Sequence, residues 1–479
     1  MVMARHVREW WNFWVICISM SLQSKSLIKN TFIYSIGSFG SKALSFLLLP
    51  LYSFFLTKKE LGEYDIFITM ISLFIPLVSL QISDSAYRWL VSDEKKSEDN
   101  ITKVITNSLV ILGVSTIIFA LIFYIYIGFS DFSYSNYFIS LLIVSSFLIF
   151  FQNILRGLGK TKEFSINGLV VTFFILACNI MFIYLLRMKV EGIILAGIIG
   201  NGIGIFYIIW QQRLYNFFNI RLLDKIFIKE MLYYSLPLVP NLMSWWLIGS
   251  AGKLVILNYL GEEANGVYAV SSRFAAILAI INSVLVLPIQ DDYLKKGSDF
   301  ESFRRVVQSF IYIQLIFVLV LSFGAPIYTK FLVEKSFYEA WMYMPLLYFG
   351  VALNTVAALM GLVYQKEQKT LRITLTTLFG GFISIIVSIL LIRDYGLLGV
   401  SFGLFMGYVI MLLSRLWDIR KRYDFKFNYI KILFISIIIT IAINTIKYIS
   451  YNIQMITFII VLILAMILTY KRLRSIIKR

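Results

Sequence analysis

The chain has 479 residues, of which 59% are apolar and 15% are charged. Soluble globular proteins have about 45–50% apolar and about 25% charged residues, so the composition excludes an ordinary soluble domain and a disordered chain. The 44 Lys and Arg residues outnumber the 26 Asp and Glu residues and give a net charge of +18. The one histidine and the two cysteines show no disulfide framework and no metal-ligand spacing, so we expect neither a metal nor a cofactor.

The first 24 residues form a tail with two possible origins. The stretch from Trp10 to Met20 is apolar but too short to cross a bilayer. It could form a helix at the membrane interface, since it carries three tryptophans. Alternatively, Met20 is the true start, and residues 1–19 are an extension that does not belong to the native protein.

Fourteen apolar segments follow, each long enough for a transmembrane helix of about 20 residues. Strands of a membrane barrel would alternate in pieces of about ten residues, and these segments do not alternate. The sequence therefore predicts an all-α integral membrane protein with about 14 transmembrane helices. In chain order the predicted spans are residues 31–56, 60–83, 104–127, 137–155, 165–186, 191–211, 231–258, 265–289, 306–327, 341–363, 371–392, 396–416, 429–449 and 453–470.

The positions of the basic residues predict the orientation of these spans. With the N-terminus in the cytoplasm, 33 of the 44 Lys and Arg residues fall in cytoplasmic segments and 8 in outside loops. Basic residues accumulate on the cytoplasmic side of membrane proteins, so we expect a multi-pass protein with both termini in the cytoplasm. The basic excess then indicates contact with anionic membrane lipids, and not a nucleic-acid partner.

The two halves of the chain resemble each other at a nearly constant spacing. Five pairs of short segments lie 200 to 207 residues apart. LGEYDI and NGVYAV pair Tyr64 with Tyr268, and LLRMKVEG and LLIRDYG pair Arg187 with Arg393. Because the repeated unit holds six spans, both copies enter the membrane in the same direction and form a parallel repeat.

This duplication predicts two six-helix lobes around a central cleft, an architecture that suits alternating access. A duplicated scaffold without transport is the alternative. The predicted parts are the tail at 1–24, an N-terminal lobe with helices 1–6 at 25–213, a cytoplasmic linker at 214–230, a C-terminal lobe with helices 7–12 at 231–417, and helices 13–14 with a basic tail at 418–479.

Proline and glycine follow the same plan. All seven prolines fall within or at the end of predicted spans, and five of them lie in helices 1, 2, 7 and 8, where they would let these helices bend: Pro50, Pro76, Pro237, Pro240 and Pro288. Membrane helices also tolerate proline without any such role. Small residues at every fourth position in helices 6 and 12 predict faces for close helix packing.

Cations inside the predicted spans are the main candidates for substrate contact. Lys42 lies about midway along helix 1, whereas Lys253 and Arg273 lie toward the outer halves of helices 7 and 8. Arg88 lies at the cytoplasmic end of helix 2. Charge inside the bilayer is costly and usually faces a polar cavity, so these residues could bind a diphosphate across the cleft. The alternative, above all for Arg88 and Arg273, is a side chain that reaches toward the interface.

The acidic residues are more ambiguous. Asp84 and Arg88 lie four residues apart, as do Asp291 and Lys295 in the other half, and this spacing allows ion pairs that could latch an inner gate or hold a coupling cation. Solvated surface pairs are the alternative. Glu63 and Asp65, near the outer end of helix 2, are candidates of the same kind. GLGKT at 157–161 lacks the first glycine of a P-loop, so we do not expect nucleotide hydrolysis.

The opening SLIKNTFIYSIGSFGSKALSFLLLPLYSFFLTKKELGEYDIF (Ser26–Phe67) resembles that of Wzx-type polysaccharide flippases. These belong to the multidrug/oligosaccharidyl-lipid/polysaccharide (MOP) exporter superfamily, which includes the MATE transporters. LQISDSAYRWL (Leu80–Leu90) and GVYAVSSRFA (Gly266–Ala275) are similar to the same pattern, and the likeness extends over about residues 25–470.

The resemblance implies a flippase in the bacterial cytoplasmic (inner) membrane. It would move an undecaprenyl-diphosphate-linked oligosaccharide, such as an O-antigen or capsule repeat unit, to the outer leaflet. Lys42 would attract the diphosphate, Arg88 would guide its approach, and Arg273 would hold it in the outward-facing state. Energy would come from a proton or sodium gradient. A polysaccharide polymerase and chain-length proteins would be partners.

Two other classes of function compete with this one. A MATE-like cation or drug antiporter should have an acidic, aromatic-lined cavity, whereas the cations here predict a basic cleft. A membrane glycan polymerase or ligase would need a large outside loop for its catalytic groups. The longest predicted outside loop, at 328–340, has only about a dozen residues. We therefore expect a transporter and not an enzyme.

Overall fold

The computed structural model describes residues 46, 48–92, 97–127, 134–294, 300–369, 371–423 and 453–465. These residues form helices joined by short connections, and no strand occurs among them. Nine helices in these ranges are long and apolar enough to cross a membrane. The predicted fold class, an all-α integral membrane protein, is confirmed.

The chain divides into two compact units. Among the described residues, unit 1 runs to Leu56 and continues over Glu63–Trp246, and unit 2 comprises Thr57–Gly62 and everything from Leu247 onward. The division therefore falls inside a helix and not in the predicted linker at 214–230. The linker and the helix after it stay with unit 1 because they pack on its core.

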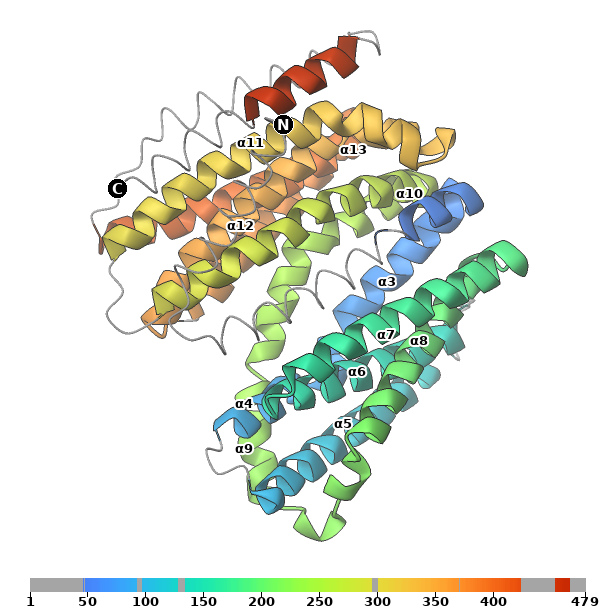
Figure 1. Cartoon of the computed structure of the whole chain (residues 1–479), viewed down its shortest axis with the longest axis vertical. Coiled ribbons are helices and arrows are strands. Elements are labelled where there is room, and N and C mark those ends of the chain that lie inside the picture. The colour runs from blue at the N-terminus through green and yellow to red at the C-terminus, as the bar shows by residue number, and fades with distance from the viewer. Residues whose placement is uncertain are drawn as a thin grey trace, which may run out of the picture. The chain divides into compact units, whose positions relative to one another are not determined.

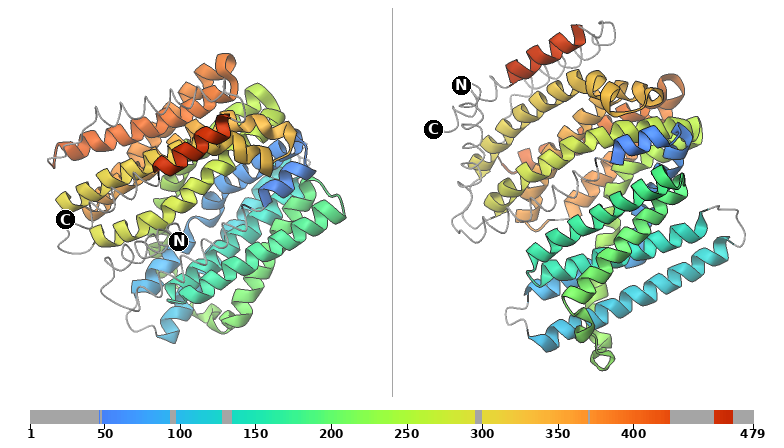
Figure 2. Two further views of the ribbon diagram at one scale, coloured as in Figure 1. Left: turned by 45° about the horizontal axis from the view of Figure 1, so that its top comes forward. Right: turned by 45° about the vertical axis from the view of Figure 1, so that its right-hand side comes forward.

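Unit 1 is built around α5 (Glu98–Ile127), α6 (Ser135–Gly157), α7 (Thr161–Asn179) and α8 (Val190–Gln211). These helices run alongside one another in Figures 1 and 2. The remaining elements are a helical stretch at 48–55, α3 (Lys58–Ser79) from Glu63 onward, α4 (Ile82–Ser92), a π-helical turn η1 (Ile180–Leu185), two 3-10 turns η2 (Leu214–Phe217) and η3 (Ile220–Leu222), and α9 (Lys225–Ser235).

Unit 2 contains most of α10 (Leu238–Leu294), α11 (Phe300–Leu332), a 3-10 turn η4 (Lys335–Met342), α12 (Met344–Lys366), α13 (Leu371–Arg420) and a last helix, Ile453–Ala465. The helices α11, α12 and α13 lie side by side (Figure 1). Pro345 occupies the first turn of α12, where its missing N–H costs nothing.

Two of these helices are each broken once by a glycine. In α10, Gly261 has a φ of 81°, and in α13, Gly396 has a φ of 55°, so neither residue continues a right-handed helix. At a rise of about 1.5 Å per residue, 57 and 50 residues are more than twice the length that a bilayer requires. Each helix therefore supplies two of the predicted spans.

The turns between helices repeat from one unit to the other. Arg187, before α8, has a φ of 54° and lies 209 residues ahead of Gly396. The end of α6 shows the same relation: the backbone N–H of Lys160 donates to the carbonyl of Leu155, and that of Lys369 donates to the carbonyl of Tyr364, also 209 residues later. The internal duplication is thus visible in backbone conformation, and it pairs Arg187 with Gly396 where the sequence comparison pairs it with Arg393.

One predicted span ends early. The sequence predicts a helix over 60–83, but α3 stops at Ser79 because Leu80 and Gln81 adopt left-handed backbone angles, with φ of 49° and 53°. A new helix, α4, begins at Ile82. Neither residue is a glycine, so the sequence carries no signal for this break. The predicted span 429–449 and most of 31–56 lie outside the described residues.

Small residues bring neighbouring helices into contact where the sequence predicts it. A Cβ placed on Gly200 or Gly204 of α8 would collide with side chains of α7, namely Ile175 and Val171. In α13, a Cβ on Gly403 would collide with Ser388 on the other arm of the same helix. These faces let the helix backbones approach closely, as expected of small-xxx-small motifs.

Candidate functional site

The intramembrane cations that the structure describes, Lys253 and Arg273, lie in unit 2. Lys253 and Arg273 are half-buried residues of α10, on either side of its break at Gly261. At about 1.5 Å per residue they lie roughly 12 and 18 Å along the helix from that break, which the sequence predicts to lie at the outer membrane surface. Both therefore lie well inside apolar helical arms. Lys42 lies outside the described residues.

Arg88 does not pair with Asp84. Its exposed guanidinium lies 4.2 Å from the ring centroid of Tyr234 and 5.4 Å from that of Trp89, both cation–π distances. The described residues contain no Asp84–Arg88 ion pair, because Arg88 packs on the Tyr234 ring of α9 whereas Asp84 faces Asn153 of α6. Arg88 is held against α9 and remains available at the surface.

Asp84 instead faces α6. Its Oδ1 lies 3.5 Å from the Asn153 amide, and Asn153 in turn accepts a hydrogen bond of 3.2 Å from Arg156. Burial raises the pKa of the Asp84 carboxyl, and the positive charge of Arg156 opposes this shift. The Arg156 guanidinium lies between the rings of Tyr87 and Phe164, at 5.0 and 5.8 Å. Asp84 is thus a partly desolvated carboxyl in the first turn of α4.

For the other acidic candidates the structure gives burial at most. Glu63 is half-buried and Asp65 is buried in the first turns of α3. Asp291 lies in the last turns of α10, but its side chain is not among the described ones, and Lys295 lies outside the described residues. Whether this second pair forms a latch stays a prediction.

The hinge candidates fall at or near helix ends and bends. Pro237 lies between α9 and α10, and Pro240 lies in the first turn of α10. Pro50 begins a turn of the helical stretch at 48–55, where Ser53 donates a hydrogen bond to its carbonyl. The helix α3 continues through Pro76 for three more residues, and α10 continues through Pro288. Their role as hinges stays a prediction.

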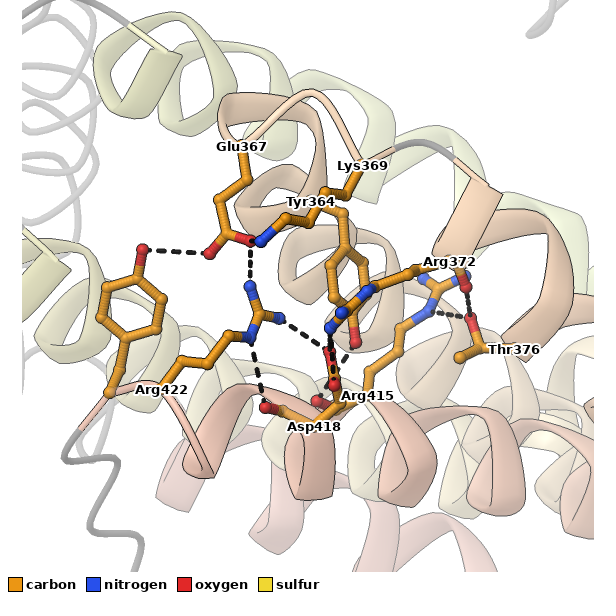
Figure 3. Close-up of polar contacts among 9 residues, drawn as sticks. Tyr364, Glu367, Lys369, Arg372, Thr376, Arg415, Asp418 and Arg422 are labelled. Carbon is orange, nitrogen blue, oxygen red and sulfur yellow. Dashed lines mark hydrogen bonds and ion pairs between the residues drawn. The ribbon is translucent and has the colours of Figure 1, made fainter.

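A charged network in unit 2 joins the end of α12 to both ends of α13 (Figure 3). The guanidinium of Arg422 lies between two carboxylates: it pairs with Glu367 and lies 2.7 Å from Asp418. Arg372 also binds Asp418, at 2.6 Å, and Lys369 lies 3.2 Å from Glu367. Alternating charges of this kind fasten three helix ends to one another.

Directly beside this network lies Arg415, which has no exposed surface. Its guanidinium donates to the carbonyl of Ala357 in α12, at 2.6 Å, and to the hydroxyls of Thr376 and Thr377 in the first arm of α13, at 3.0 and 2.9 Å. Because α13 continues to Arg420, Arg415 is held on a helix and turns inward, away from solvent. Arg415 ties three helical arms together.

The sequence indicates which residues of α13 share the face of this network, but it does not indicate the partner at the end of α12. Arg415, Asp418 and Arg422 follow a spacing of three and four residues, which marks one face of a helix. Glu367, the partner of Arg422, is some fifty residues away, and only the packing of α12 on α13 brings it close. Hydrogen bonds from Lys369 and Tyr423 and the charge of Arg422 outweigh its desolvation and hold the pKa of Glu367 below its ordinary value. The arrangement fastens helices and provides no nucleophile–base pair.

Among the residues that the structure describes, no three His, Cys, Asp or Glu side chains gather as a metal site would require.

Comparison with known proteins gives one family and one fold. The family model described as "Polysaccharide biosynthesis protein" matches residues 27–291, more than half of the chain. An uncharacterized membrane protein of Methanocaldococcus jannaschii, MJ1375, is 24% identical over 298 residues, which cover 58% of this chain and 69% of that relative.

Two solved structures show the same arrangement of helices. The lipid II flippase MurJ, in an inward closed conformation, superposes with a TM-score of 0.71 at 15% identity, over 94% of this chain and 100% of that one. An inward-facing MATE multidrug transporter of the MOP superfamily superposes with a TM-score of 0.62 at 15% identity, over 82% and 94%. The fold is therefore that of MOP exporters, as the resemblance implied.

Proposed function

The chain belongs to the polysaccharide biosynthesis protein family, and from this premise we propose that it moves a lipid-linked oligosaccharide across the bacterial cytoplasmic membrane. It is a multi-pass membrane protein of the flippase and transporter type, and not an enzyme. The proposed substrate is an undecaprenyl-diphosphate-linked repeat unit of an O-antigen or capsule. The proposed movement is from the cytoplasmic to the outer leaflet, by alternating access.

The family match carries this proposal, and the intramembrane cations support the substrate class. Lys253 and Arg273 are long basic side chains inside apolar arms of α10. A charge in that position is costly unless it faces polar groups or water. A diphosphate offers oxygens that such cations bind with short, charge-assisted hydrogen bonds. The same residues would repel the cationic substrates of a MATE-like drug antiporter.

Energy coupling is proposed to use an ion gradient, with Asp84 as the first candidate for a proton. Its carboxyl is partly buried beside Asn153 and Arg156, and burial raises its pKa. Under this proposal Asp84→Asn uncouples transport from the proton gradient, while the variant still reaches the membrane. If an imposed pH gradient drives the variant as well as the native protein, Asp84 has no part in coupling.

The flippase proposal is tested by removing the protein and by changing its cations. Depletion should cause lipid-linked repeat units to accumulate in the cytoplasmic leaflet, where a membrane-impermeant glycan-modifying reagent cannot reach them. Replacement of Lys42 or Arg273 by alanine should reproduce this accumulation at unchanged protein level. Lys335→Ala, which removes an exposed cation outside the long helices, serves as the matched control. Normal surface glycan after depletion would contradict the proposal.

A further inference from the structure

Between α8 and α10 the chain forms a strap, residues 213–236, which has one inner and one outer face. On the inner face Leu214, Phe217, Phe227 and Met231 join the apolar core of unit 1. On the outer face seven large apolar residues remain exposed over this short stretch: Tyr215, Phe218, Ile220, Leu223, Ile226, Tyr233 and Leu236. Ile226 and Tyr233 are 73% and 84% exposed and lie seven residues apart, on one side of α9.

The strap is bonded to unit 1, so its outer face has a defined orientation. Three residues of α5 hold it: Lys103 pairs with Asp224 at 2.7 Å, Thr106 accepts from the backbone of Asn219, and Asn107 bonds the backbone of Leu222 and Asp224. On the other side of the strap, Ser85 of α4 donates to the carbonyl of Met231 at 3.1 Å. The inner residues are fixed, and the outer ones cannot turn inward.

We propose that this outer face is seated in the interfacial layer of the bilayer and binds anionic lipid headgroups. The strap lies at the junction of two candidate membrane-crossing stretches, since α8 ends at Gln211 and the next stretch, Lys225–Leu294, contains α9 as well as α10. This places the strap at the membrane surface. Exposed aromatic and aliphatic side chains alternate along it with exposed basic ones: Arg213, Arg221, Lys225 and Lys229. Apolar residues with intervening Lys and Arg are the composition of helices that lie in the interface.

The charge of the strap favours lipid over a protein partner. Asp224 is occupied by Lys103, and Glu230 is the one other acidic residue in the segment. The exposed outer face is therefore strongly basic, which complements the anionic lipids of a cytoplasmic leaflet. The proposal is independent of the transported substrate, because it concerns how unit 1 sits at the membrane and not what crosses it.

Fluorescence quenching in vesicles tests the inference. In a background with Cys17 and Cys178 replaced by serine, Ile226→Cys and Tyr233→Cys are labelled with an environment-sensitive dye and reconstituted in vesicles of phosphatidylcholine and phosphatidylglycerol. A nitroxide near the lipid headgroup should quench both labels, and aqueous iodide should not. Asn100→Cys, an exposed polar position in the first turn of α5 and outside the strap, is the control and should respond to iodide.

The basic residues of the strap allow a second test in the same vesicles. Replacement of Arg221 and Lys225 by glutamine should reduce nitroxide quenching at position 226 roughly two-fold, as should vesicles of phosphatidylcholine alone. Iodide quenching at 226 and 233 equal to that at 100 would overturn the inference. Protection from both quenchers would also overturn it, because it would mean that a protein covers the face. Thermal melting of each labelled variant confirms that it is folded.

Discussion

Gly62 and Gly266 lie backbone against backbone in unit 2. A Cβ on Gly62 would overlap the carbonyl oxygen of Glu262, and a Cβ on Gly266 would overlap that of Lys58. Each of these carbonyls belongs to the residue four positions before the other glycine, so the contact is reciprocal. The Asn265 amide completes it with a hydrogen bond of 3.0 Å to the Gly62 carbonyl. The internal repeat thus makes contact with itself through equivalent residues.

Substitution at this crossing should destabilise the protein. Gly62→Ala or Gly266→Ala places a methyl group against a backbone carbonyl that cannot rotate away, which costs roughly 1–3 kcal/mol or more. The measurement is the melting temperature in detergent. Gly113→Ala and Gly202→Ala are matched controls, because a Cβ at either position meets nothing within 4 Å. Equal melting temperatures for all four variants would show that the helices do not cross here.

The buried guanidinium of Arg415 should be irreplaceable by lysine. Its planar group reaches Ala357, Thr376 and Thr377 in different directions, and an ammonium group on a flexible stem cannot make the same set of bonds. Arg415→Lys should therefore lower stability by roughly 1–3 kcal/mol, and Arg415→Ala, which also leaves a cavity, by more. Arg420→Lys, at an exposed position of the same helix, is the control. A melting temperature of Arg415→Lys equal to the native one would contradict this account.

The Glu367 network should make stability depend on pH on the acid side. Because the pKa of Glu367 is lowered in the folded state, its ionised form adds stability above its ordinary pKa of 4.5, and this is lost as the pH falls through the lowered value. Glu367→Gln should flatten the fall in melting temperature between pH 7 and pH 4. Glu263→Gln, an exposed carboxylate of α10, should leave the native profile unchanged. Parallel profiles for the two variants would refute the assignment.

Asn107 should control how firmly the strap is held. Its side chain is fully buried, accepts from the backbone of Asp224 at 2.9 Å and donates to the carbonyl of Leu222 at 3.0 Å. Asn107→Ala leaves two backbone groups without these partners, so the strap should open more often. Trypsin should then cleave after Arg221 or Lys225 several-fold faster than in the native protein. Asn100→Ala, at an exposed position of α5, is expected to have no effect, and equal cleavage rates would show that the strap is held elsewhere.

Long apolar runs were the sequence features that predicted the structure best. Runs of about 20 apolar residues predicted spans at nearly every long helix that the structure describes, because a bilayer demands that length. Breaks within a helix were harder to predict from the sequence. The left-handed turn at Leu80 and Gln81 has no glycine, and packing rather than intrinsic preference holds these residues there.

The candidate site shows a similar division. Cations within apolar runs can be identified from sequence, and Lys253 and Arg273 lie in α10 on either side of its break at Gly261. The partners of charged residues cannot be identified in this way. Asp84 and Arg88 have the spacing of an ion pair, yet Asp84 faces Asn153 on α6 and Arg88 lies on the ring of Tyr234 from α9. Spacing along one helix sets which residues share a face and does not set what that face meets.

By itself the sequence determined that this chain spans a membrane and that its halves resemble each other, since these follow from the length of apolar runs and from residues repeated along one chain. Its family was indicated by the resemblance of segments such as Ser26–Phe67 to known flippases. Only the tertiary structure decided that Arg415 is buried between three helical arms and that Glu367 pairs with Arg422. It also decided that one face of the strap is bonded down while the other is exposed. The physical reason is that hydrogen bonds and ion pairs act over a few ångströms, and the groups that they join can be fifty or a hundred residues apart.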